Sequence, residues 1–279
     1  DIGDMRLALD GAFETTTPKA PPVAIPQWRR VALVGAAALI VGVVLTSTAV
    51  WYAMRPTPPL LVRTEISTSG ASVLSINGID RDLVITPDGS RIVYRGVDQL
   101  LVRALDQLTP TALTGLGAPR GPFISPDGQW VGFFDGASSV LKKVAITGGP
   151  AVTITKLDSS LGPRGATWGS DGTIVFATSK PNAGLLRVSA AGGEPTVLTT
   201  PNRESGQVYH VWPEFLPGGQ AVLFTIAPVV GGNLDNAQIA VLDLRTNTQT
   251  VLVRGGSHAH YLPSGHLVYG AGGTLRAVA

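Results

Sequence analysis

Three of the chain's four histidines lie within nine residues of one another, as His258, His260 and His266. On a regular strand His258 and His260 point to the same face, which is one way to present two imidazoles to a metal ion. No cysteine, aspartate or glutamate is close in sequence, so a third ligand would have to come from elsewhere, such as His210. Solvated or hydrogen-bonded side chains and contacts to a partner are the alternatives, and we expect no bound metal.

Tryptophan and arginine side chains stand in the segments that lead into two of the chain's turn motifs. Arg164 and Trp168 precede one such motif, and Trp212 precedes the next. Both residue types are typical anchors at binding surfaces, although tryptophans also pack between structural units. The candidate residues for contact with a partner or ligand are therefore Arg164, Trp168, His210, Trp212, His258 and His260.

The motifs of the common catalytic classes are absent from the sequence. There is no glycine-rich phosphate loop followed by a strand lysine, no His-Arg-Asp and no Asp-Phe-Gly, as a kinase requires. There is no Gly-x-Ser-x-Gly motif, and the absence of cysteine excludes disulfides, thiolate catalysis and zinc–thiolate sites. We predict no catalytic residue and no cofactor in this chain.

Residues 31–54 contain no charge, no proline and no amide side chain. As a helix they span ~36 Å, enough to cross a hydrocarbon core of about 30 Å, so we predict a transmembrane helix in contact with the lipid bilayer. A buried core helix and a signal peptide are the alternatives. Arg29 and Arg30 precede the span and Arg55 follows it, which favours a cytoplasmic N-terminus.

Small residues recur at four-residue spacing inside the predicted span, as Ala38, Gly42 and Thr46. Such a stripe lets two helices approach closely, so a homodimer through the membrane helix is an open expectation.

The composition favours short strands and turns after this span. Only 14% of the residues are charged, and the chain holds 34 glycines and 21 prolines. The net charge of +2, without a lysine or arginine cluster, argues against a nucleic-acid partner.

A turn motif of four residues recurs five times at spacings of 39 to 47 residues, which is typical of a repeat architecture. Proline presets φ for a turn, Asp or Ser bonds to the local backbone, and the last glycine accepts positive φ. The tetrads are Thr86-Pro87-Asp88-Gly89, Ser125-Pro126-Asp127-Gly128, Gly169-Ser170-Asp171-Gly172, Leu216-Pro217-Gly218-Gly219 and Leu262-Pro263-Ser264-Gly265. We assign their third and fourth residues a structural role in these turns.

Each tetrad is followed by two apolar runs with the pattern of strands, and three repeats continue into a turn and a third run. With a strand leading into the tetrad, each repeat holds four antiparallel strands. Four strands per ~45 residues form one blade of a β-propeller, in which neighbouring blades bury one another's faces. The sequence thus predicts an all-β propeller of about five blades, its ring incomplete, after one transmembrane helix.

The repeats resemble those of TolB-type propellers, whose blades carry a Ser-Pro-Asp-Gly turn, an apolar strand and a run ending in Leu-Thr, as in Leu113-Thr114 and Leu198-Thr199. The whole layout is similar to the C-terminal part of bacterial membrane-anchored serine/threonine protein kinases, in which a kinase domain ends in a segment like residues 1–7.

The resemblance implies five parts of the chain. They are the end of a cytoplasmic domain (1–13), a proline-rich linker (14–30), the membrane helix (31–54), a proline-rich stalk (55–60) and an extracytoplasmic propeller truncated at its C-terminus (61–279). ATP and magnesium are expected only for a kinase domain upstream of the chain.

Three functional hypotheses follow. The first is a non-catalytic sensor that binds an extracytoplasmic protein or small ligand for a single-pass kinase of the bacterial inner membrane. The second is a membrane-tethered periplasmic scaffold without a kinase. The third is a propeller enzyme such as a lyase or lactonase, which the lack of a metal-ligand set disfavours.

Overall fold

The computed structural model describes residues 27–53, 65–66, 72–76, 78–158, 162–228 and 233–279, and divides into two units, Asp1–Leu61 and Val62–Ala279. The predicted end of a cytoplasmic domain (1–13) and the stalk (55–60) lie outside the described residues, as does the linker up to residue 26.

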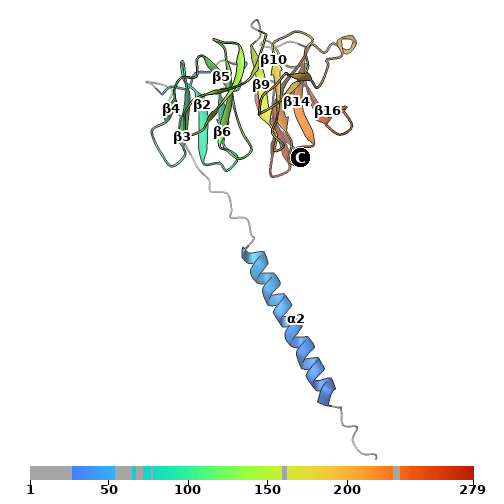
Figure 1. Ribbon diagram of the computed structural model, residues 1–279. Helices are drawn as coiled ribbons and strands as arrows, with labels where there is room; N and C mark the ends of the chain where they lie inside the picture. The colour runs from blue at the N-terminus through green and yellow to red at the C-terminus, as the bar shows by residue number, and fades with distance from the viewer. Residues whose placement is uncertain (1–26, 54–64, 67–71, 77, 159–161, 229–232) are drawn as a thin grey trace, which may run out of the picture. The chain divides into compact units, whose positions relative to one another are not determined.

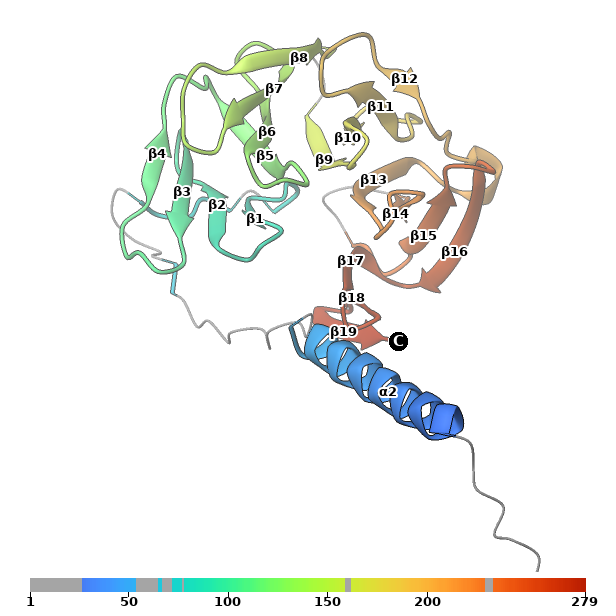
Figure 2. The ribbon, with the colours of Figure 1, turned by 60° about the horizontal axis from the view of Figure 1, so that its bottom comes forward.

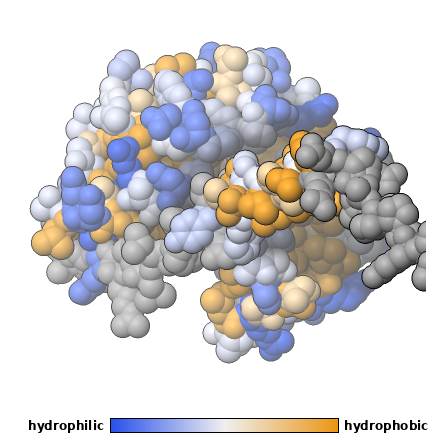
Figure 3. Space-filling model, turned by 90° about the horizontal axis from the view of Figure 1, so that it is seen from below, coloured by the Kyte–Doolittle hydropathy of each residue, from blue (hydrophilic) through white to orange (hydrophobic). Residues whose placement is uncertain are grey.

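Within its described residues, the first unit contains one helix, α2 (Gln27–Ala53). The helix begins at Gln27, four residues before the predicted start at residue 31. A helical backbone does not require apolar side chains, so the polar residues that follow Pro26 in sequence also belong to the helix. Its segment Val31–Tyr52 is long and apolar enough to cross a membrane, and its side chains are exposed within the unit (Figure 3). Inside this segment the Thr46 hydroxyl donates to the Gly42 carbonyl (2.7 Å), so it needs no water partner.

Within its described residues, the second unit is built from five antiparallel sheets, each formed by strands consecutive in sequence (Figure 1). The first blade comprises β1 (Leu83–Ile85), β2 (Arg91–Arg95), β3 (Leu100–Ala104) and β4 (Thr111–Leu113). The second comprises β5 (Pro119–Ile124), β6 (Trp130–Asp135), β7 (Val140–Ala145) and β8 (Val152–Lys156). The third comprises β9 (Pro163–Trp168), β10 (Thr173–Thr178), β11 (Leu186–Ser189) and β12 (Thr196–Val197).

The fourth blade comprises β13 (Tyr209–Phe215), β14 (Ala221–Ala227), β15 (Gln238–Asp243) and β16 (Thr248–Arg254), after a short 3₁₀ helix at Arg203–Ser205. The fifth comprises β17 (Ser257–Leu262), β18 (His266–Ala271) and β19 (Thr274–Val278), so within the described residues it has three strands. Figure 2 shows the blades following one another around a common centre, with the first strand of each blade innermost. The predicted β-propeller is confirmed.

The hydrophobic core lies between the faces of neighbouring blades. Val93 and Leu100 of the first blade pack with Val131 and Phe133 of the second, and similar clusters join each later pair. By contrast, β19 is exposed along its whole length, including Leu275. Neighbouring blades therefore bury each other's faces. Among the described residues, nothing covers the outer strand of the fifth blade.

The five tetrads form tight turns between the first two strands of each blade. In each, the amide of the final glycine donates to the carbonyl of the first residue, at 2.8 to 3.1 Å. These final glycines all have positive φ, between 67° and 83°, as the turn requires. Hydrogen bonds from Thr86 and Ser90 lower the pKa of Asp88 to about 2.

The last two repeats form this turn without an aspartate. The Leu216 and Leu262 carbonyls accept the hydrogen bonds that close these two turns. In the last turn Ser264 stands where the first three repeats have aspartate, and its hydroxyl contacts His266 Nδ1. Backbone conformation alone therefore suffices to close the turn.

Candidate functional site

The innermost strands share a backbone irregularity at one blade position. Five residues before the second residue of the tetrad, φ is positive in blades two to five, at Gly121 (56°), Gly165 (90°), Trp212 (52°) and His258 (53°). The pairing register shifts around this position in β5, β13 and β17. Glycine adopts such a conformation freely, whereas a bulky residue there is strained and marks a place of functional interest.

The two bulky residues at this position stack on each other across the fourth and fifth blades. The ring centroids of Trp212 and His258 lie 3.4 Å apart with 27° between their planes. The His258 amide donates to Thr225 Oγ1 (3.1 Å), and the Trp212 indole N–H donates to the Ile79 carbonyl (3.0 Å). Burial, with the nearby charges of Arg81 and His260, lowers the pKa of His258 to about 4, so its imidazole is neutral at neutral pH.

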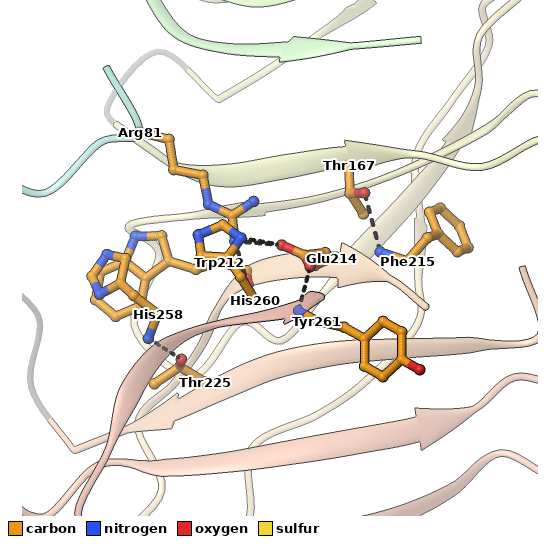
Figure 4. A network of polar contacts seen from close by, with 9 residues as sticks. All are labelled: Arg81, Thr167, Trp212, Glu214, Phe215, Thr225, His258, His260 and Tyr261. Atoms are coloured by element: carbon orange, nitrogen blue, oxygen red, sulfur yellow. Dashed lines mark hydrogen bonds and ion pairs between the residues drawn. The ribbon is translucent and has the colours of Figure 1, made fainter. Parts of the chain in front are cut away.

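Glu214 is the centre of a polar network that joins three parts of the propeller (Figure 4). Its carboxylate lies 2.5 Å from His260 Nδ1 and 3.7 Å from Arg81 Nη2, and it accepts from the Tyr261 amide (3.0 Å). Arg81 Nη2 also donates to the Trp212 carbonyl (3.4 Å). Burial raises the pKa of Glu214, but His260 and Arg81 outweigh that effect and hold it below its usual range.

A second polar cluster joins the segment before β1 to blades two and three. Arg120 places Nη2 at 2.7 Å and Nε at 2.9 Å from Asp80 Oδ2, and the Asp80 side chain is fully buried. Arg164 donates from Nη1 to the Pro163 carbonyl (2.6 Å). The pKa of Arg164 is lowered from its usual value, mainly by burial. The charge of Arg120 lowers it further, and the charge of Asp80 opposes this effect. Asp80 is thus close to the guanidinium groups of two neighbouring blades.

The ends of the innermost strands line an open cavity of about 400 Å³ where all five tetrads converge. Its wall combines three aromatic side chains with one carboxylate, those of Trp168, Phe215, Tyr261 and Glu214. The Phe215 amide donates to Thr167 Oγ1 (3.2 Å) and so ties blade four to blade three beside it. The tetrads contribute Pro87, Pro126, Gly169, Ser170, Leu216, Pro217, Gly218, Gly219 and Pro263.

The structure brings most of the candidate residues to the propeller axis. Trp212 and His258 form the stack, His260 joins Glu214, Trp168 lines the cavity, and Arg164 lies near Asp80. These contacts combine aromatic surface with charged groups, which is an arrangement that can bind a peptide or a small polar ligand.

His210 is separate from this group. It is fully buried, with Nδ1 2.7 Å from Thr199 Oγ1, Nε2 3.1 Å from Gln207 Oε1 and its ring against Phe224. Burial lowers its pKa to about 4. The suggestion that it could join the other histidines is wrong, because both ring nitrogens are engaged within blade four and its neighbouring loop.

The regular alternation that we assumed for His258 and His260 is also interrupted. The positive φ of His258 and the register shift between Ser257 and His260 give the two imidazoles different partners. Within the described parts of the chain, no group of three His, Cys, Asp or Glu side chains is placed to hold a metal ion.

Sequence reasoning missed Asp80, Arg81, Arg120, Glu214 and Tyr261. One signal for two of them was present, because Arg81, Arg120 and Arg164 all stand six residues before the second residue of their tetrad. No comparable signal marks Glu214, whose role depends on contacts from two other parts of the fold.

Comparison with known proteins identifies the fold and no family. No family description and no curated protein matches the sequence. Among solved structures, a putative TolB from Agrobacterium tumefaciens matches with 19% identity and a TM-score of 0.53, over 67% of this chain and 68% of that one. TolB from Acinetobacter baumannii matches with 18% identity and a TM-score of 0.51, over 70% of this chain and about half (53%) of that one.

A solved enzyme structure matches equally well. An oligogalacturonate lyase from Vibrio parahaemolyticus matches with 17% identity and a TM-score of 0.52, over 71% of this chain and 59% of that one. At these identities the likeness concerns the fold alone, since one fold hosts many functions. The chain carries a five-bladed, TolB-like β-propeller and one N-terminal apolar helix.

Proposed function

We propose that this chain is a non-catalytic interaction module, whose propeller binds a protein segment or small ligand in the cavity where the tetrads converge. The observation that carries this proposal is the composition of the cavity wall. Trp168, Phe215 and Tyr261 supply aromatic surface, and Glu214 supplies one partly buried, ion-paired charge. Aromatic anchors around a few fixed polar groups are typical of binding sites. A TolB-like propeller fold is compatible with such an interaction scaffold.

The helix α2 acts, in this proposal, as a single span of the bacterial inner membrane. Its length and apolar surface support a span, and Arg29 and Arg30 before it support a cytoplasmic N-terminus. The propeller then lies on the extracytoplasmic side. Fusing alkaline phosphatase to the C-terminus of the full chain tests this topology, because the enzyme is active only outside the cytoplasm. An inactive fusion of normal abundance would exclude it.

The finer form of the proposal is a sensor for a serine/threonine protein kinase, with ligand-linked association of two membrane helices through Ala38, Gly42 and Thr46. It rests on the resemblance of residues 1–7 to the end of a kinase domain. The coding frame upstream of Asp1 tests it. A glycine-rich loop, strand lysine, His-Arg-Asp and Asp-Phe-Gly there support the sensor, whereas a start codon within a few residues favours the tethered periplasmic scaffold.

Site-specific photocrosslinking tests the cavity in the full chain, in cells. A benzophenone amino acid at Tyr261 should give a discrete adduct, which the additional substitution Trp168→Ala should reduce at least fivefold. The same probe at Leu108, a fully exposed side chain in the β3–β4 turn, is the matched control. Equal adducts at both positions, or none at Tyr261, would reject the cavity as the binding site.

A further inference from the structure

Three arginines occupy one equivalent position in the first three blades. Arg81, Arg120 and Arg164 each stand six residues before the second residue of their tetrad, at or just before the innermost strand. All three side chains are partly buried. We call Arg81, Arg120 and Arg164 the arginine ring, because the equivalent positions of successive blades surround the axis.

The carboxylates beside the arginine ring belong to the chain itself. Asp80 accepts from Arg120, and Glu214 pairs with Arg81. Arg164 uses Nη1 on its neighbour's carbonyl, while its buried Nε has no hydrogen-bond partner among the described residues. The ring therefore retains an unused donor, and guanidinium forks are suited to binding planar carboxylates.

The segment before β1, which bends at residues 78–80, lies against these groups through both its backbone and its side chains. The Ile79 carbonyl accepts from the Trp212 indole, Asp80 meets Arg120 near Arg164, and Arg81 reaches the Trp212 carbonyl and Glu214. Backbone and side chains are thus both recognised, by blades two and four. The Asp80 side chain is fully buried, so the interactions with these partners must replace the hydration that its carboxylate loses.

We propose that the arginine ring is a recognition site for an acidic peptide segment and that Asp80 occupies it as an internal ligand. The backbone contact at Ile79 favours a peptide over a free anion, because a peptide supplies a carbonyl for the Trp212 indole as well as a carboxylate for Arg120. This inference rests on the proposed function in that the partner binds along the axis. It adds the chemistry recognised there: a carboxylate together with a backbone carbonyl of the same bent peptide segment.

Fluorescence anisotropy with the full chain in detergent micelles tests the proposal. The probe is a labelled, N-acetylated peptide amide Gly-Ile-Asp-Arg, matching residues 78–81, and the control probe has Asn in place of Asp. The substitution Asp80→Asn removes the internal carboxylate, and Asp98→Asn, at an exposed loop position, is the matched control. We expect Asp80→Asn to bind the Asp probe at least tenfold tighter than the wild type and the Asp98→Asn variant do.

The same variant should prefer the Asp probe to the Asn probe at least tenfold, and adding Arg164→Gln should abolish this preference. A folded Asp80→Asn chain that binds neither probe, or both equally, would overturn the proposal. Displacement of the probe by an equal concentration of inorganic phosphate would also overturn it, since the site would then recognise anions in general.

Hydrogen exchange of the wild-type chain provides a test without any folding risk. Excess Asp probe should accelerate exchange at the Ile79–Asp82 amides at least tenfold as the segment is displaced, and the Asn probe should not. No acceleration would contradict the proposal. Photocrosslinking at Tyr261 reports on the cavity independently, so failure of the carboxylate site and failure of the proposed function give different results.

Discussion

The rings of Trp212 and His258 lie face to face with centroids 3.4 Å apart, and both residues have positive φ at the same position of neighbouring blades. The equivalent residues in blades two and three are Gly121 and Gly165. The fold therefore uses glycine at this position where no side chain is needed, and a strained aromatic residue where one faces the axis. The backbone strain is offset by stacking and burial.

The stack predicts an unusual titration of Trp212 fluorescence. Because burial lowers the pKa of His258 to about 4, its imidazole should become charged and quench the stacked indole only near pH 4. We expect a quenching step with that midpoint in the difference between the wild-type chain and the His258→Asn variant, while circular dichroism shows both folded. Asparagine tolerates positive φ and so isolates the imidazole. A midpoint near pH 6.5 would contradict a buried imidazole.

Removing the charge of Glu214 should destabilise the propeller. In Glu214→Gln the guanidinium of Arg81 and the imidazole of His260 lose their carboxylate partner, and both Arg81 and Glu214 are mostly shielded from water. We expect a loss of about 1–3 kcal/mol in the free energy of unfolding, measured with denaturant on the full chain.

The control for this loss is Asp243→Asn, which removes the charge of an exposed pair with Arg245 at a similar distance (3.7 Å). Exposed pairs contribute little, so no measurable change is expected. Equal effects of the two substitutions would show that the network around Glu214 contributes no more than a surface ion pair.

Two glycine substitutions separate backbone strain from steric contact between blades. At Gly165 φ is 90°, and an added Cβ would lie 2.9 Å from the Trp212 Cα. At Gly172 φ is 79°, with nothing within 4 Å. We expect Gly165→Ala to cost about 2–4 kcal/mol of stability and Gly172→Ala about 1–2 kcal/mol, as measured by denaturant unfolding. If Gly172→Ala costs as much stability as Gly165→Ala, or more, the close approach of blade four to Gly165 adds nothing to the cost of the substitution there.

The buried imidazole of His210 makes stability depend on pH. The unfolded chain binds a proton at this residue near pH 6.5, whereas burial holds the folded pKa at about 4. As the pH falls from about 6.5 to about 4, the unfolded state gains protons first and the free energy of unfolding decreases, by about 2–3 kcal/mol for this residue.

Unfolding at a series of pH values should therefore show a shallower slope in His210→Gln than in the wild type. Identical slopes in the two chains would mean that His210 takes up its proton equally in the folded and unfolded states.

Several features of this protein could be predicted from the sequence because they depend on local signals. The tetrads at Asp88 and Asp127 form tight turns through contacts within six residues, so their spacing indicates the blades. The apolar run after Arg30 predicts the helix, although its start at Gln27 does not follow from hydropathy, since helical backbone extends into polar residues. Both signals are properties of a short stretch of chain.

The site on the axis was decided by the tertiary structure alone. Glu214 acquires its role from Arg81 and His260, which are 133 and 46 residues away, and Asp80 from Arg120, 40 residues away. His210 looked similar to the other histidines in sequence, yet Thr199 and Gln207, in the connection between blades three and four, bind both of its ring nitrogens. A repeat pattern determines where each strand runs, but which side chains meet depends on the bulge in each strand and on how neighbouring blades pack.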